Sequence, residues 1–329
     1  MKTALSIITF AAAAAAATCG VAHAQSSVKV FGVVDMGLTK GNGGTATNAG
    51  ANGGDKAWSL RQAKSSRLGF QGNEDLGDGL SVQFLLDHRF EPDTGAAAAI
   101  FWHGRSYIQL TSKRYGSLWM GRDYMPAFYM ASRTHPFGWD GVGQMGTSQM
   151  AGYRAINGVR TPNTLGYKSP RINGFSFRLS NSFGEGETAR ETGLNIEYQA
   201  GALWLGVGYD TMRGGPSATD GNRLVNAGLT YDLGRVKPML YLARTKTAGG
   251  TVDNQAWSMG ALVKLGAGSL KVAYGQMDPD GDDNTVQKFS IGYDYPLSKR
   301  TELYADFGLG KEDQKTDNRA IGFGLRHSF

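Results

Sequence analysis

The sequence predicts an all-β protein, a transmembrane antiparallel β-barrel of sixteen strands. Three observations predict this fold. Apolar and polar residues alternate with a period of two along the chain, as in strands that face two different environments. The connections between these segments are short and long in alternation. After residue 24, no apolar run is long enough for a membrane-spanning helix.

The N-terminal residues 1–24 are predicted to be a signal peptide that is removed. Lys2 forms a short basic region, residues 4–17 form an apolar core, and Ala22-His23-Ala24 fits an A-x-A cleavage site. Cys19 lies in this segment and is a poor match to a lipid-attachment site. The mature chain, 25–329, then has no cysteine for a disulfide or a thiolate metal site, and we expect it to form one barrel domain.

In segments spread over the whole mature chain, apolar residues take every second position and polar residues take the positions between them, so that each strand has an apolar and a polar parity. The clearest are 28–39, 80–89, 175–180, 194–199, 257–264 and 288–294. A soluble sandwich of two sheets could also show this alternation. It would not easily explain sixteen strands with regular short and long connections, so the barrel is favoured.

The connections predict an up-and-down barrel that has short turns at one rim and long loops at the other. Seven short ones, rich in Gly, Pro, Asn and Asp, are predicted as tight turns: 77–79, 112–115, 170–173, 200–201, 232–235, 266–268 and 296–300. Eight long ones are predicted as loops: 41–65, 91–101, 123–162, 184–192, 211–222, 246–253, 277–285 and 311–317. A barrel of sixteen strands is too wide for its own side chains to fill, so we expect a water-filled interior.

The longest connection, about 123–162, has no sustained period of 2 or 3.6. Compact proteins rarely contain such a connection unless it is functional or disordered. It is rich in aromatic residues that can pack, including Tyr124, Phe128 and Phe137. We therefore expect this third long loop to fold into the barrel and narrow it.

Several motifs carry a family resemblance that covers nearly the whole mature chain. They are Val28–Asp35, Ser66–Phe70, Glu74–Gly77, Leu118–Arg122, Arg160–Thr164 and Gly324–Phe329. With them, the sequence resembles the general diffusion porins of the Gram-negative outer membrane, in their beta-proteobacterial form. The resemblance implies homotrimers, an inward third loop, passive diffusion of small hydrophilic solutes and ions, and a terminal Phe329 that is read by the insertion machinery. We also expect export through the Sec pathway by the cleaved signal peptide, and contact with outer-membrane lipid and lipopolysaccharide.

Fixed charges at the narrowest part of a channel decide which ions pass, because low-dielectric walls focus their field. Strand parity places Arg67, Arg89 and Arg105 on the polar face, and the long loop carries more arginine than aspartate. We therefore predict a modest preference for anions, although these arginines could instead pair with carboxylates such as Asp87. The predicted constriction residues are Arg67, Arg89, Arg105, Arg122, Asp123, Arg133, Asp140, Arg154 and Arg160.

No constellation for catalysis, cofactor or metal binding is evident. Residues 141–146 fit G-x-G-x-x-G, but no strand precedes them and no helix pattern follows. The acidic run 278–283 lacks the glutamate of a calcium loop. Without Lys2, 33 basic residues face 28 acidic ones, a charge of +5 with no basic block for nucleic acid. We therefore expect that the protein is not an enzyme. Two alternatives are an outer-membrane hydrolase and a surface adhesin that acts through exposed loops.

Overall fold

The computed structural model describes residues 27–41, 57–138, 140–145, 159–186, 189–214, 220–250, 252–279, 285–313 and 317–329. The predicted signal peptide, residues 1–24, and Arg154 of the long loop lie outside these ranges. No helix among the described residues is both long and apolar enough to cross a bilayer.

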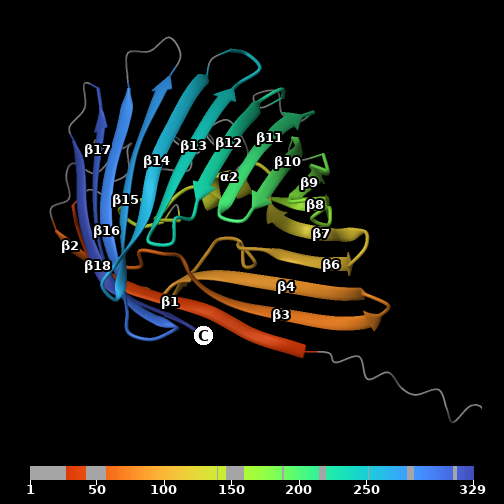
Figure 1. Ribbon diagram of the computed structural model, residues 1–329, viewed down its shortest axis with the longest axis horizontal. Coiled ribbons are helices and arrows are strands. Elements are labelled where there is room, and N and C mark those ends of the chain that lie inside the picture. Colours follow the sequence, from red (N-terminus) through yellow and green to blue (C-terminus); the bar gives the residue numbers. More distant parts are fainter. Residues whose placement is uncertain are drawn as a thin grey trace, which may run out of the picture.

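The described chain forms one antiparallel sheet that wraps around the single described helix, α2 (Phe128–Arg133) (Figure 1). Sixteen strands make the wall. They are β1 (Ser27–Gly41), β3 (Ser66–Gly77), β4 (Leu80–Glu91), β6 (Ser106–Ser112), β7 (Gly116–Tyr124), β8 (Arg160–Lys168), β9 (Phe175–Ser182), β10 (Arg190–Ala200), β11 (Leu203–Arg213), β12 (Arg223–Tyr231), β13 (Val236–Lys246), β14 (Asp253–Leu265), β15 (Gly268–Pro279), β16 (Val286–Pro296), β17 (Thr301–Glu312) and β18 (Asn318–Ser328). Two short strands, β2 (Trp58–Arg61) and β5 (Ala96–Ala97), pair with β1 and β4.

The sheet closes on itself through its first and last strands. β1 pairs with β3 on one side and with β18 on the other, so that Val33 faces both Arg67 and Ser328. Gly32 and Phe329 exchange two backbone hydrogen bonds of 3.1 Å. The wall therefore has no free edge, and the predicted closed barrel of sixteen strands is confirmed.

Every wall strand is antiparallel to its neighbours along the chain, so the connections alternate between two rims. Each predicted turn and loop overlaps a gap between two observed wall strands. In the turn between β3 and β4, Asp78 has φ +50° between Gly77 and Gly79 at +85° and +75°, which explains the glycines on either side. Three short elements were not predicted, α2, β2 and β5, because two to six residues are too few to show a period.

Burial along the strands is inverted relative to a water-soluble protein. On the outer face, Ile196 and Val207 are 44% and 52% exposed. On the inner face, Asn195 and Asp210 are only 1% and 0% exposed. An apolar exterior with polar groups inside fits a wall that faces acyl chains on one side and a hydrated lumen on the other.

The outer face yields a first prediction about stability in the bilayer. Val207→Arg places a charge on the lipid-facing side near the middle of β11 and should cost about 2 to 4 kcal/mol of folding free energy. Urea titration of the protein folded into lipid vesicles would measure this loss. The control Val207→Leu keeps the face apolar and should change the free energy little. Equal stability of the two variants would contradict a lipid-facing position.

Candidate constriction of the barrel lumen

The chain leaves the wall after β7 and packs on the inner face of the barrel. Three inward side chains hold the start of α2: the amides of Asn195 and Asn226 donate to the carbonyls of Pro126 and Ala127, at 2.8 and 2.9 Å. The Ala127 amide donates to the carboxylate of Asp210 at 3.3 Å. These contacts come from three neighbouring strands, β10, β11 and β12. They fix one end of the loop segment 125–145 inside the lumen.

The wall under α2 is lined with glycine. A β-carbon added to Gly206 would lie 2.2 Å from the Met130 sulfur, and one added to Gly208 would lie 2.7 Å from the Ala127 α-carbon. No side chain other than hydrogen leaves enough room for this approach. Part of the glycine surplus in the sequence therefore serves to let the loop lie flat on the wall.

Two lysines hold the far end of the described loop segment. The Lys288 ammonium donates to the Val142 carbonyl at 2.8 Å. Lys271 lies 4.8 Å from the ring centre of Phe137, which is 1% exposed, and it pairs with Asp294 and Asp306 at 2.6 and 2.9 Å. The loop is thus anchored on β15 to β17 as well as on β10 to β12.

The same environment affects His135 in the loop. Burial lowers its pKa to about 3, and the nearby charges of Lys288 and Lys271 add to this effect. The imidazole is therefore neutral at physiological pH. His135 adds no charge to the lumen.

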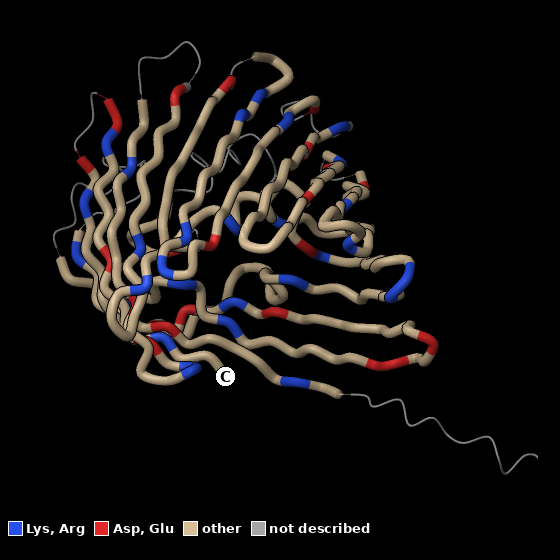
Figure 2. Tube along the Cα trace, viewed as in Figure 1, with Lys and Arg blue, Asp and Glu red and all other residues tan. Residues whose placement is uncertain are grey.

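A group of basic residues gathers in the lumen near β3 and β4, away from the strands β10 to β12 that hold the start of α2. Arg67 and Arg89 face each other across β3 and β4, at the end of these strands away from their shared turn (Figure 2). The charges of Lys64, Arg67, Arg89 and Arg160 all act on the Asp140 carboxyl. We call these four residues the cationic ladder.

The ladder carries more positive charge than its carboxylates can offset. Arg89 pairs with Asp87 at 3.1 Å. Among the described residues, no carboxylate lies within 4.0 Å of the charged groups of Lys64, Arg67 or Arg160. Three of the four cations near Asp140 therefore have no ion-pair partner among the described residues.

Burial shifts the proton affinity of two groups here. It raises the pKa of the Asp140 carboxyl above its ordinary value, although the neighbouring cations oppose this shift. It lowers the pKa of the Lys64 ammonium to about 8, assisted by the charges of Arg326 and Lys271.

Arg105 and Asp123 form an ion pair instead of contributing opposite free charges. The Arg105 guanidinium contacts the Asp123 carboxylate at 2.6 and 3.2 Å and lies 4.9 Å from the Tyr107 ring centre. Arg122 lies where the register of β7 against β8 shifts, and its Nε donates to the His103 carbonyl at 3.2 Å. The charges of Arg122, Arg160 and Arg89 all act on the His103 ring.

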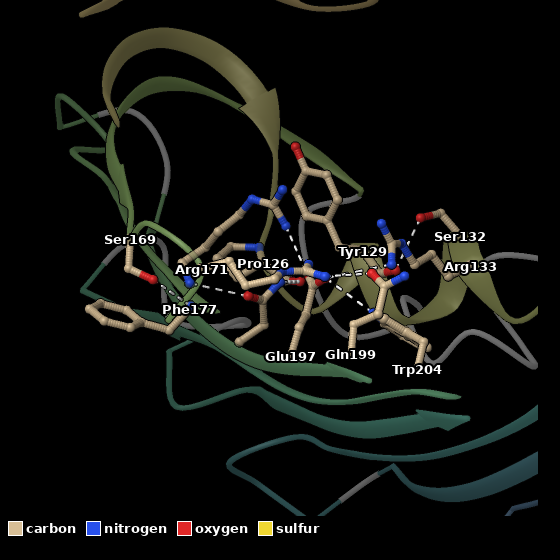
Figure 3. A network of polar contacts seen from close by, with 12 residues as sticks. Pro126, Tyr129, Ser132, Arg133, Ser169, Arg171, Phe177, Glu197, Gln199 and Trp204 are labelled. Atoms are coloured by element: carbon tan, nitrogen blue, oxygen red, sulfur yellow. Dashed lines mark hydrogen bonds and ion pairs between the residues drawn. The ribbon is translucent and has the colours of Figure 1, made fainter. Parts of the chain in front are cut away.

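Arg133, the last residue of α2, lies in a different part of the lumen, next to β10 and β11 (Figure 3). Its guanidinium stacks over Trp204 at 5.2 Å and contacts Glu197 at 3.8 Å. Glu197 also accepts hydrogen bonds from Arg178 at 2.8 Å and from the Trp204 indole at 3.1 Å. Arg178 in turn lies 3.8 Å from the ring centre of Tyr129 in α2.

The structure thus brings together part of the predicted set. Arg67, Arg89, Arg160 and Asp140 share one side of the lumen, and Arg122 lies near Arg160. Arg105 is paired with Asp123, and Arg133 is placed elsewhere. Arg154 lies outside the described residues. The sequence analysis did not name several other cations of the lumen, which are Lys64, Arg178, Lys271, Lys288 and Arg326. Those that belong to strands alternate with the apolar, outward-facing residues, and this pattern could have identified them.

Cavities lie next to two parts of the described loop segment. One of about 430 Å³ is lined by residues 140–142 of the loop and by Tyr304 of the wall. Another of about 740 Å³ is lined by Ser132 and Arg133 and by the turn 201–202. The loop therefore narrows the lumen without filling it.

Comparisons with known proteins agree with this architecture. The family model described as Gram-negative porin matches residues 11–315. The chain is 31% identical over 318 residues to outer membrane porin protein 32 of Delftia acidovorans, covering 91% of this chain and 88% of that protein. The solved anion-selective porin from Comamonas acidovorans superposes with a TM-score of 0.82 at 26% identity, covering 93% and 100% of the two chains. The trimer form of OmpT from Vibrio cholerae gives 0.71 at 15%, covering 92% and 99%.

The anchors of α2 give a second prediction. Asn226→Ala removes the amide that donates to the Ala127 carbonyl and to the Tyr241 hydroxyl, although the carbonyl keeps its hydrogen bond from the Met130 amide. The loss of these two hydrogen bonds should cost about 1 to 3 kcal/mol. Because the loop is then held less firmly, limited proteolysis should cut within 125–145 faster than in the unmodified protein. Ser176→Ala, a change to another buried inner-face residue, is the control and should leave cleavage unchanged. Identical cleavage of Asn226→Ala and the control would show that Asn226 is not an anchor.

Proposed function

Because this chain belongs to the Gram-negative porin family, we propose that its water-filled outer-membrane channel prefers anions among the small hydrophilic solutes and ions that it passes. The observation that carries this proposal is the cationic ladder, in which Lys64, Arg67 and Arg160 have no carboxylate partner among the described residues. The printed name of the Comamonas acidovorans relative, an anion-selective porin, supports it.

The size of the effect follows from Coulomb's law. One unpaired charge about 6 Å from a passing ion is worth roughly 0.7 to 3 kcal/mol for effective dielectric constants of about 80 to 20. The sign is favourable for an anion and unfavourable for a cation. Salt screens this energy over about 10 Å, so charges close to the ion path dominate. A few such charges suffice for a modest selectivity.

Three other inward carboxylates, Asp35, Glu302 and Asp306, have local partners. Asp35 accepts hydrogen bonds from the Tyr304 hydroxyl at 2.8 Å and from the Ala63 amide at 2.9 Å. Glu302 pairs with Arg326, and Asp306 pairs with Lys271. The ion pairs thus offset the charges of Glu302 and Asp306, whereas Asp35 keeps its charge and remains one carboxylate that opposes the ladder.

The remaining parts of the proposal concern assembly and placement. We propose that the chain forms homotrimers in contact with outer-membrane lipid and lipopolysaccharide, with the long loops outside and the short turns in the periplasm. The trimer form of OmpT, which shares the fold, supports the oligomer. Export through the Sec pathway would use residues 1–24, and Phe329, which lies at the seam with Gly32, would serve as the assembly signal.

A third prediction tests the anion preference directly. Reconstituted channels under a potassium chloride gradient should show a reversal potential of the sign for chloride. Replacing Arg67, Arg89 and Arg160 together by Gln should reduce the anion-to-cation ratio about tenfold or more, since each 1.4 kcal/mol is a factor of ten. Arg114→Gln, in the turn between β6 and β7, is the control and should have little effect. A clear cation preference of the unmodified channel would overturn the proposal.

The ladder also yields a prediction about pH. The pKa of Asp140 is raised, so acidification removes its negative charge at a higher pH than for an ordinary carboxyl, and the anion preference should increase. The pKa of Lys64 is about 8, so above that pH a positive charge is lost and the preference should fall. Reversal potentials measured across pH would show both steps.

Two variants assign these steps to their residues. Asp140→Asn should remove the acid step, and Lys64→Met should remove the alkaline step. A profile that both variants leave unchanged would contradict the assignment.

A further inference from the structure

A second positively charged site lies away from the cationic ladder. The cavity of about 740 Å³ extends from α2 to the short turns that join β10 to β11 and β12 to β13. Its polar lining comes from the loop, with Ser132 and Arg133, and from the wall, with Gln199 and Lys237. None of the ladder residues lines it.

Arg133 is held in place but retains donors for a ligand. Its guanidinium lies over Trp204, whose indole N–H is fixed by Glu197. The contact of Arg133 with Glu197 is long, 3.8 Å, and it is made to the oxygen that accepts from the Trp204 indole at 3.1 Å. The other oxygen accepts from Arg178 at 2.8 Å. The Arg133 side chain is 48% exposed. A fixed guanidinium with open N–H groups loses little entropy when it binds a ligand.

The other polar groups of the cavity also offer donors. The oxygen of Gln199 accepts a hydrogen bond from Arg171 at 2.5 Å, which leaves its amide N–H groups for the cavity (Figure 3). Lys237 lies on the inner face of β13 and forms no ion pair with a described residue. The single lining carboxylate, Asp232, accepts the Gly234 amide at 2.8 Å within its own turn.

We propose that this cavity is a binding station for the oxyanion group of a small solute, a carboxylate or a phosphate, held between Arg133 and Lys237. The guanidinium fork matches the paired oxygens of either group, whereas chloride offers one acceptor to a single N–H direction. The inference rests on the proposed anion channel and adds a saturable site to it. Anions would pass the ladder and the station as separate steps.

The test is block of chloride current in reconstituted channels by inorganic phosphate, with acetate as a second probe. Phosphate should reduce the chloride current saturably. Arg133→Gln and Lys237→Gln should each raise the half-blocking concentration about tenfold, the loss of one charged hydrogen bond. Block by both probes would indicate a general oxyanion site, and block by phosphate alone a site for phosphate groups.

Two controls separate this station from the channel's general selectivity. Lys299→Gln, in the turn between β16 and β17 and outside the cavity, should leave the block unchanged. Arg67→Gln should shift the reversal potential but not the block. Absence of saturable block, or equal block of Arg133→Gln and the unmodified channel, would overturn the station even if the reversal potential still showed anion preference. A cation preference would instead overturn the anion channel itself.

Discussion

Backbone pairing in a medium without water is the constraint on which the rest of this structure depends. A strand edge that faces acyl chains leaves amide and carbonyl groups without partners, at a cost of several kcal/mol for each group. The ring of sixteen strands avoids this cost because β1 pairs with β18 and the last residue, Phe329, bonds to Gly32. Closure at this circumference has a consequence, since the interior is wider than its side chains can fill.

The loop 125–145 occupies this interior and has a core of its own. Phe137, Met130 and Ala131 are at most 1% exposed, so the described apolar core lies inside the barrel around the loop. Asn195, Asp210 and Asn226 satisfy its backbone at one end, and Lys288 does so at the other. A polar inner wall is thus needed both for the hydrated path and for holding the segment that narrows it.

Strand parity, together with the alternation of short and long connections, was sufficient to predict the barrel and its strand number, and parity placed Arg67 and Arg89 on the polar face. Parity is a local property of a repeating pattern and needs no knowledge of partners. The pairing of Arg105 with Asp123 and of Lys271 with Asp306 depends on cross-strand neighbours, which sequence spacing does not reveal. Arg133 was grouped with the other constriction residues because it belongs to the long loop, which was expected to fold into the barrel. In the structure its guanidinium lies over Trp204 instead.

The glycines beneath α2 make the bore sensitive to residues that carry neither charge nor reactive group. At Gly208 a β-carbon would lie 2.5 Å from the Asn226 side-chain oxygen and 2.7 Å from the Ala127 α-carbon, and the latter is backbone, which cannot swing aside as a flexible side chain would. An alanine codon at this position would displace the start of the loop toward the centre of the pore. A single base change could thereby narrow the bore for bulky solutes while every charged side chain that lines it stayed in place.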